Sequence, residues 1–127
     1  MILLDTQAVY WGVSTPDRLG PGARELINSS VNRYISSITH VEIRINAMNG
    51  MLQLPDDLDV AILRAGLLPL PFTAAHATAM QRFPQLRAHG PFDRMLVAQA
   101  AHERMDFLTA DRALLALEEP WIVDATK

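Results

Sequence analysis

Four acidic residues, far apart in the sequence, could together perform metal-dependent chemistry. Asp5 ends the short apolar run ILLD, and Asp111 follows the later apolar run FLT. Glu42 and Asp93 fall within the first two turns of predicted helices, Asp93 in the stretch PFDRMLVAQA. A carboxylate in an apolar helix is costly unless a partner neutralises it. This cost suggests that Asp93 has a function beyond helix formation.

The predicted positions of these acids favour one shared site. In open α/β sheets, ligands bind beyond the carboxyl ends of the strands, where Asp5 and Asp111 are expected. Carboxylates brought together repel one another unless one is protonated or a cation binds. An all-oxygen ligand set favours Mg²⁺ or Mn²⁺. Such a site suits phosphodiester hydrolysis, with two ions about 3.5–4 Å apart when both are present.

Short apolar runs that alternate with helical segments predict the fold that would position these acids. The runs are continuous rather than alternating in polarity, as in parallel strands covered on both faces. We therefore predict an α/β fold with a mainly parallel sheet, formed by one domain over residues 1–127. The expected strands are 2–5, 33–38, 67–72, 106–111 and 121–125.

Capping and stop signals predict the helices between these strands. A helix with Ser37 as its N-cap ends at Asn49-Gly50, and another begins after Pro55. The longest helix has Pro91 near its first position. Further helices are expected over residues 23–30, 112–119 and from Thr73 onwards, and a helix or turn is expected to start over residues 8–11.

Each acid also has a purely structural interpretation. Asp5 and Asp111 could each cap the helix that follows. Glu42 lies three residues after Thr39, which matches a capping box. Asp93 could interact with the dipole of its own helix. The functional interpretation therefore depends on the convergence of the whole set.

Composition narrows the class of protein. The chain has 127 residues, half of them hydrophobic, which is typical of one globular domain. Cysteine is absent, so neither disulfides nor thiolate metal sites are expected, and a cytoplasmic location fits. No apolar run is long enough for a membrane span, and the N-terminal segment does not have the pattern of a secretory signal. The net charge of −3 argues against a broad basic surface for nucleic acid.

Four segments carry a family resemblance, namely ILLDT, YISSITHVEI, PFDRMLVAQA and FLTADRAL. They resemble the PIN-domain family and, within it, the VapC-type toxins of bacterial toxin–antitoxin pairs. They occur in the family's order and span nearly the whole chain, and the third is the most specific.

The resemblance implies a PIN-like three-layer sandwich and a Mg²⁺- or Mn²⁺-dependent endoribonuclease. It implies that such a protein is often a homodimer and is inhibited by a cognate antitoxin. By position, the acidic metal site of the family corresponds to Asp5, Glu42, Asp93 and Asp111, and its hydroxyl residue to Thr109. Ser37 corresponds to a small polar position that opens the helix carrying Glu42.

Two positions depart from the pattern of many relatives. Gly90 stands where they carry an acid, and Gln7 where they carry histidine. Neither departure touches the four acids, so the metal site is retained and only substrate detail is affected. His89 is interpreted as a loop residue, with a position facing the groove as the alternative.

Several other side chains could contact RNA. Arg94 and Arg112 directly follow two of the acids and are the preferred candidates for phosphate contacts, with ordinary surface arginine as the alternative. Tyr10 and Trp11 could stack on bases. For those two aromatic residues, however, burial in the core or in a dimer interface is favoured.

Two other functions fit parts of the pattern. A phospho-acceptor signalling domain also collects acids at strand ends, but it needs a lysine late in the sheet. The only lysine here is Lys127, which argues against that class. A PIN-fold binding module without catalytic activity is the other alternative.

Overall fold

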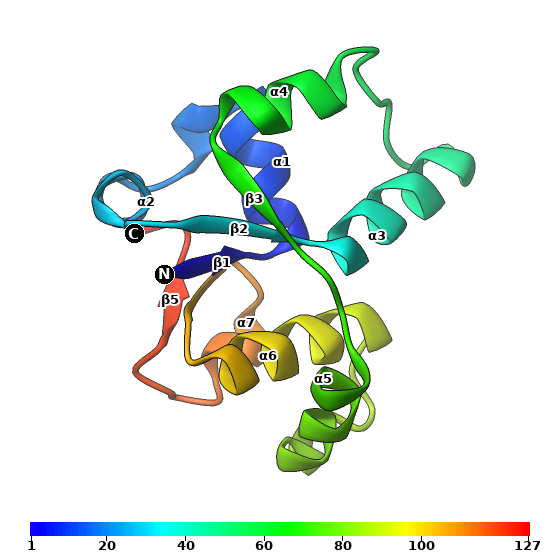
Figure 1. Cartoon of the computed structure of the whole chain (residues 1–127), viewed down its shortest axis with the longest axis vertical. Helices are drawn as coiled ribbons and strands as arrows, with labels where there is room; N and C mark the ends of the chain where they lie inside the picture. The colour runs from blue at the N-terminus through cyan, green and yellow to red at the C-terminus, as the bar shows by residue number, and fades with distance from the viewer.

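A five-stranded sheet forms the middle layer of the molecule, with helices on both of its faces (Figure 1). The computed structural model describes residues 1–127. The strand order is β3-β2-β1-β4-β5, and every neighbouring pair is parallel. The α/β prediction is therefore confirmed. The strands are β1 (Ile2–Leu4), β2 (Arg33–Ser36), β3 (Leu67–Leu70), β4 (Asp106–Thr109) and β5 (Ile122–Asp124).

The helices form the two outer layers. Helices α1 and α4 lie on one side of the sheet, and α5, α6 and α7 lie on the other (Figure 1). The α-helices are α1 (Thr6–Ser14), α2 (Pro21–Ser29), α3 (Ser37–Met48), α4 (Leu58–Arg64), α5 (Ala74–Ala79), α6 (Pro91–Glu103) and α7 (Arg112–Leu115). Three short 3₁₀ turns complete the chain: η1 (Pro16–Arg18), η2 (Met80–Arg82) and η3 (Pro84–Leu86). None of the helices is both long and apolar enough to span a bilayer.

Two separate hydrophobic clusters hold the layers together. Ile2 and Leu4 of β1 join one cluster, whereas Leu3 between them joins the other. This division follows from the strand geometry, in which successive side chains point to opposite faces. Because β1 is buried on both faces, it is apolar throughout, as the sequence predicted.

Cap geometry corrects the predicted start of α3. Ser37 was expected as the N-cap, but the extended residue before it, Ser36, occupies that position and accepts a bond from the Ile38 N–H at 3.0 Å. Ser37 is the first helical residue, and its hydroxyl accepts from the Phe72 N–H at 3.0 Å instead. The strand predicted over residues 33–38 therefore ends at Ser36.

Two predicted helices are shorter than expected. The helix expected after Pro55 begins only at Leu58, because residues 56–57 form a turn. The helix expected over residues 112–119 ends at Leu115. Glu118 has a φ of 57°, a left-handed conformation that cannot continue a right-handed helix.

Candidate metal centre

The four predicted acids line a single cavity of about 460 Å³. Asp5 directly follows β1, and Asp111 lies two residues after β4. Asp93 lies in the first turn of α6, and Glu42 lies in the second turn of α3. The four acids thus meet at one cavity, as the sequence predicted, and their role as metal ligands stays a prediction. The cavity is lined by Asp5, Thr6, Gln7, Tyr10, Trp11, Glu42, Ile43, Asn46, Met51, Leu52, Asp93, Ala110 and Asp111.

Asp5 is the most buried of the four acids, with 4% of its surface exposed. Its Oδ1 accepts the Ala8 N–H at 2.7 Å and so caps α1. Its Oδ2 accepts a short hydrogen bond from the Thr109 hydroxyl. The capping interpretation and the site interpretation are therefore compatible, since each oxygen keeps a further lone pair for a ligand.

Thr109 connects two of the acids without lining the cavity. Its hydroxyl donates to Asp5 and accepts the N–H of Asp111 at 3.0 Å. The residue is completely buried at the end of β4. Thr109 therefore positions the acids rather than contacting the contents of the cavity.

Glu42 is held by a residue that the sequence interpretation missed. The Thr6 hydroxyl donates to Glu42 Oε1 at 2.7 Å and lies 3.1 Å from the hydroxyl of Thr39. Because the Thr6 proton goes to the carboxylate, Thr39 is the donor of the second bond. The alternative interpretation, a capping box formed by Thr39 and Glu42, is wrong, because Thr39 is buried within α3 and both side chains turn toward α1.

Asp93 and Asp111 share a neighbour, His89. The Nε2 of His89 lies 3.0 Å from Asp93 Oδ2 and 3.3 Å from Asp111 Oδ2. Asp111 uses its other oxygen to cap α7, accepting the Leu114 N–H at 3.1 Å. His89 does lie in a loop, as the sequence suggested, but it also contacts two of the acids.

Burial and mutual repulsion disfavour negative charge in this cavity. Burial raises the pKa of Asp5 to about 7, and Asp93 and Glu42 add to this effect, against the hydrogen bonds from Thr109 and Ala8. Burial and then the charge of Asp93 raise the pKa of Glu42. Burial and then the charge of Asp111 raise the pKa of Asp93, although His89 opposes the shift.

These carboxylates fit a hard divalent cation. All four residues line one cavity, and the positive charge of an ion would offset the repulsion that disfavours their ionised forms. The ligand chemistry matches Mg²⁺ or Mn²⁺.

The two arginines predicted to contact phosphate do not line the cavity. Arg112 is exposed and contacts Asp124 at 3.3 Å. Arg94 turns back toward the carbonyl of Arg87, also at 3.3 Å. Both arginines therefore have a local contact, and they differ in exposure: Arg112 is exposed beside Asp111, whereas Arg94 is partly buried.

Tyr10 and Trp11 lie at the same cavity as the acids and are not simply buried in the core. Both side chains line the cavity and are partly exposed. Trp11 also packs against the core, and the guanidinium of Arg18 lies 5.1 Å from its ring centroid. The sequence favoured burial in the core or in a dimer interface, because neighbouring helical residues give no indication of which one faces a cavity.

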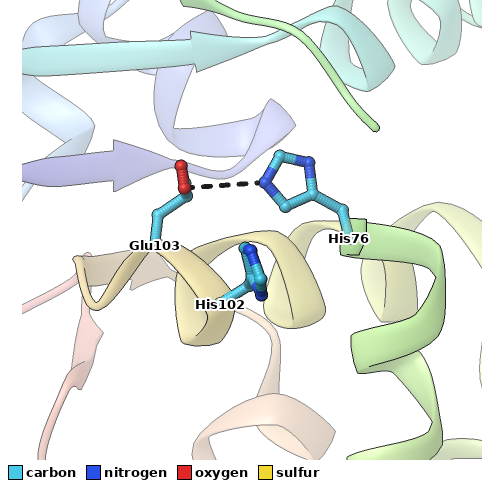
Figure 2. A group of neighbouring side chains, drawn as sticks. All are labelled: His76, His102 and Glu103. Atoms are coloured by element: carbon cyan, nitrogen blue, oxygen red, sulfur yellow. Dashed lines mark ion pairs between the residues drawn. The ribbon is translucent and has the colours of Figure 1, made fainter. Parts of the chain in front are cut away.

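A second cluster, formed by His76, His102 and Glu103, lies between α5 and α6 (Figure 2). The positions of these residues along the chain do not have the spacing of a ligand motif, because the cluster joins two helices. Their potential ligand atoms lie within 4.8 Å of one another, and His76 Nε2 is 3.8 Å from Glu103. However, His76 Nδ1 accepts the Thr73 N–H at 2.9 Å, so its neutral ring carries the proton on Nε2. Metal binding at Nε2 would require loss of this capping bond, and we interpret the cluster as structural.

Several solved structures that share this fold are toxin–antitoxin complexes. The chain matches VapBC2 from Rickettsia felis, solved with a promoter DNA fragment, with a TM-score of 0.69 and 17% identity over 98% of this chain and 97% of the other. A toxin–antitoxin complex from Klebsiella pneumoniae matches with a TM-score of 0.69 and 17% identity, over 97% of this chain and 96% of the other. DNA-bound VapBC from Salmonella typhimurium matches with a TM-score of 0.62 and 21% identity, over 97% of this chain and 95% of the other. At these identities, the likeness establishes the fold.

The sequence comparison identifies the family. No curated protein matches the chain. The family model described as PIN domain matches residues 2–120, nearly the whole chain and all four acids. The protein therefore belongs to the PIN-domain family.

Proposed function

We propose that this protein is a metal-dependent endoribonuclease and the toxin component of a VapC-type toxin–antitoxin pair. The observation that carries the proposal is the convergence of four carboxylates in one cavity of a PIN domain. The structural relatives, which are toxin–antitoxin complexes, support the biological role.

Asp5, Glu42, Asp93 and Asp111 would hold Mg²⁺ or Mn²⁺. Such an ion, when bound, supplies a Lewis acid for the phosphate and lowers the pKa of water so that it can attack phosphorus. Thr109 and the Ala8 N–H fix the two oxygens of Asp5, and Thr6 fixes Glu42. These bonds keep the carboxylates oriented before substrate arrives, which reduces the reorganisation needed for reaction.

RNA would reach the site through local contacts rather than a broad basic surface, given the net charge of −3. Tyr10 and Trp11 line the cavity and offer aromatic faces on which unpaired bases could stack. Arg112 is exposed next to Asp111 and could contact a phosphate. This arrangement favours single-stranded or looped RNA, whose unpaired bases are free to stack on aromatic side chains.

An acidic cavity also suits inhibition by an antitoxin. A basic side chain from an antitoxin segment could enter among the carboxylates and replace the metal charge. We further propose, from family resemblance, that the protein acts as a homodimer in the cytoplasm.

The test is cleavage of total RNA by purified protein, with and without Mn²⁺, followed by mapping of the cut ends. Asp93→Asn removes one proposed ligand and should abolish cleavage while leaving folding and antitoxin binding largely intact. The exposed Asp17→Asn is the matched control and should cleave normally. Undiminished cleavage by Asp93→Asn would refute the role of Asp93. Absence of cleavage by the wild-type protein with Mn²⁺ would favour the non-catalytic binding module.

A further inference from the structure

His89 contributes an imidazole nitrogen at the edge of the carboxylate cluster. Its Nε2 lies within hydrogen-bonding distance of both Asp93 Oδ2 and Asp111 Oδ2, at 3.0 and 3.3 Å. All three potential ligand atoms lie within 4.8 Å of one another. One nitrogen and two oxygens are therefore close enough together to bind one ion.

Several contacts fix this arrangement. The backbone N–H of His89 bonds to the Leu86 carbonyl at 2.8 Å, directly before α6 begins. Asp93 lies one helical turn away on α6, and Asp111 is held by its capping bond to Leu114. The three side chains are about three-quarters buried, with 24%, 29% and 29% exposed. Because all three side chains are largely buried, their contacts differ from an ion pair on the solvated surface.

We propose that His89 is a direct ligand of the divalent ion held by Asp93 and Asp111. The inference rests on the proposed metal centre and adds to it a nitrogen donor. Nε2 of His89 makes the side-chain hydrogen bond to Asp93, and Nδ1 has no hydrogen-bond partner, so the ring proton can move to Nδ1 when Nε2 binds an ion. In His76, by contrast, the Nδ1 bond to Thr73 keeps the proton on Nε2.

A nitrogen ligand changes which ions the centre prefers. Mg²⁺ prefers oxygen ligands, whereas Co²⁺ and later first-row ions accept imidazole readily. Loss of His89 should therefore weaken Co²⁺ binding strongly and Mg²⁺ binding only slightly. If His89 served instead as a positive counter-charge competing with the ion, its removal would strengthen the binding of both.

Calorimetric titration with Co²⁺ and Mg²⁺ distinguishes these possibilities. We expect His89→Ala to lower Co²⁺ affinity at least about tenfold and Mg²⁺ affinity less than about threefold, on the scale typical of perturbed metal sites. His102→Ala, which removes an exposed histidine from the second cluster, should change neither. Electron spin echo spectroscopy of bound Mn²⁺ should show ¹⁴N coupling in the wild-type protein but not in His89→Gln.

The outcomes separate this inference from the proposed function. Unchanged or tighter Co²⁺ binding by His89→Ala overturns the inference, and so does a loss confined to His102→Ala. If Asp93→Asn still abolishes binding in those cases, the carboxylate centre stands without His89. If the wild-type protein binds neither ion, both the inference and the proposed metal dependence fail.

Discussion

The raised pKa of Asp5 predicts that the metal-free protein loses stability as pH rises. The ordinary pKa of this carboxyl group is 3.8, and burial raises it to about 7 in the folded protein. Between these values the folded state keeps a proton that the unfolded state has released, so the free energy of unfolding falls with increasing pH. Below about pH 4 both states are protonated, and the effect is absent.

The magnitude follows from the two pKa values. Each pH unit within the interval corresponds to about 1.4 kcal/mol, so Asp5 alone should reduce stability by about 3 kcal/mol between pH 4.5 and 7.5. The raised pKa values of Glu42 and Asp93 act in the same direction. The lowered pKa of His40 acts in the opposite direction below its ordinary value of 6.5, and it moderates the slope.

Urea unfolding in the presence of EDTA, followed by tryptophan fluorescence, measures this slope. Asp5→Asn removes the titrating group, so its stability should depend much less on pH, whatever its absolute value. The exposed Asp17→Asn is the matched control and should keep the wild-type slope. A flat wild-type profile, or an unchanged slope in Asp5→Asn, would refute the reasoning.

Three further predictions test the residues that support the centre. Thr6→Val removes the donor to Glu42 and should weaken Mn²⁺ binding about tenfold in calorimetry, whereas Thr6→Ser should retain it. Thr109→Val leaves Asp5 without its hydroxyl donor and should lower the free energy of urea unfolding by about 1–3 kcal/mol; a smaller change would contradict its bridging role. Mn²⁺ at 100 times its dissociation constant should stabilise the wild-type protein by about 2.7 kcal/mol in thermal unfolding. Asp93→Asn should show no such gain, and equal stabilisation of both proteins would place the ion elsewhere.

The sequence was sufficient for the fold and for the four acids because both depend on simple regularities. Continuous apolar runs such as ILLD indicate buried parallel strands, and parallel strands place their carboxyl ends at one edge. Asp5 and Asp111 follow directly from this rule. Pro91 marks the start of α6 and hence places Asp93 in its first turn.

The hydrogen-bonding partners could not be predicted in the same way. Thr6 directly follows Asp5, and its position beside a strand-end acid was an available signal. Its bond to Glu42, however, requires the packing of α1 against α3, which local sequence does not specify. His89 presented a similar difficulty, because its contact with Asp111 joins segments separated in the chain.

The predicted start of α3 was wrong because two neighbouring residues are equally suitable as N-caps. Ser36 and Ser37 are both good caps, and only the length of the pairing between β2 and β3 decides which one is extended. The early end of α7 depends on the left-handed conformation of Glu118, which its residue type does not favour.

The central claim is that four carboxylates from distant parts of the chain hold one divalent centre. Anomalous diffraction from a crystal grown with Mn²⁺ tests it most directly. We predict a strong anomalous peak within bonding distance of carboxylate oxygens from Asp5, Glu42, Asp93 and Asp111. An empty cavity at saturating Mn²⁺, or a peak only at His76, His102 and Glu103, would contradict the claim.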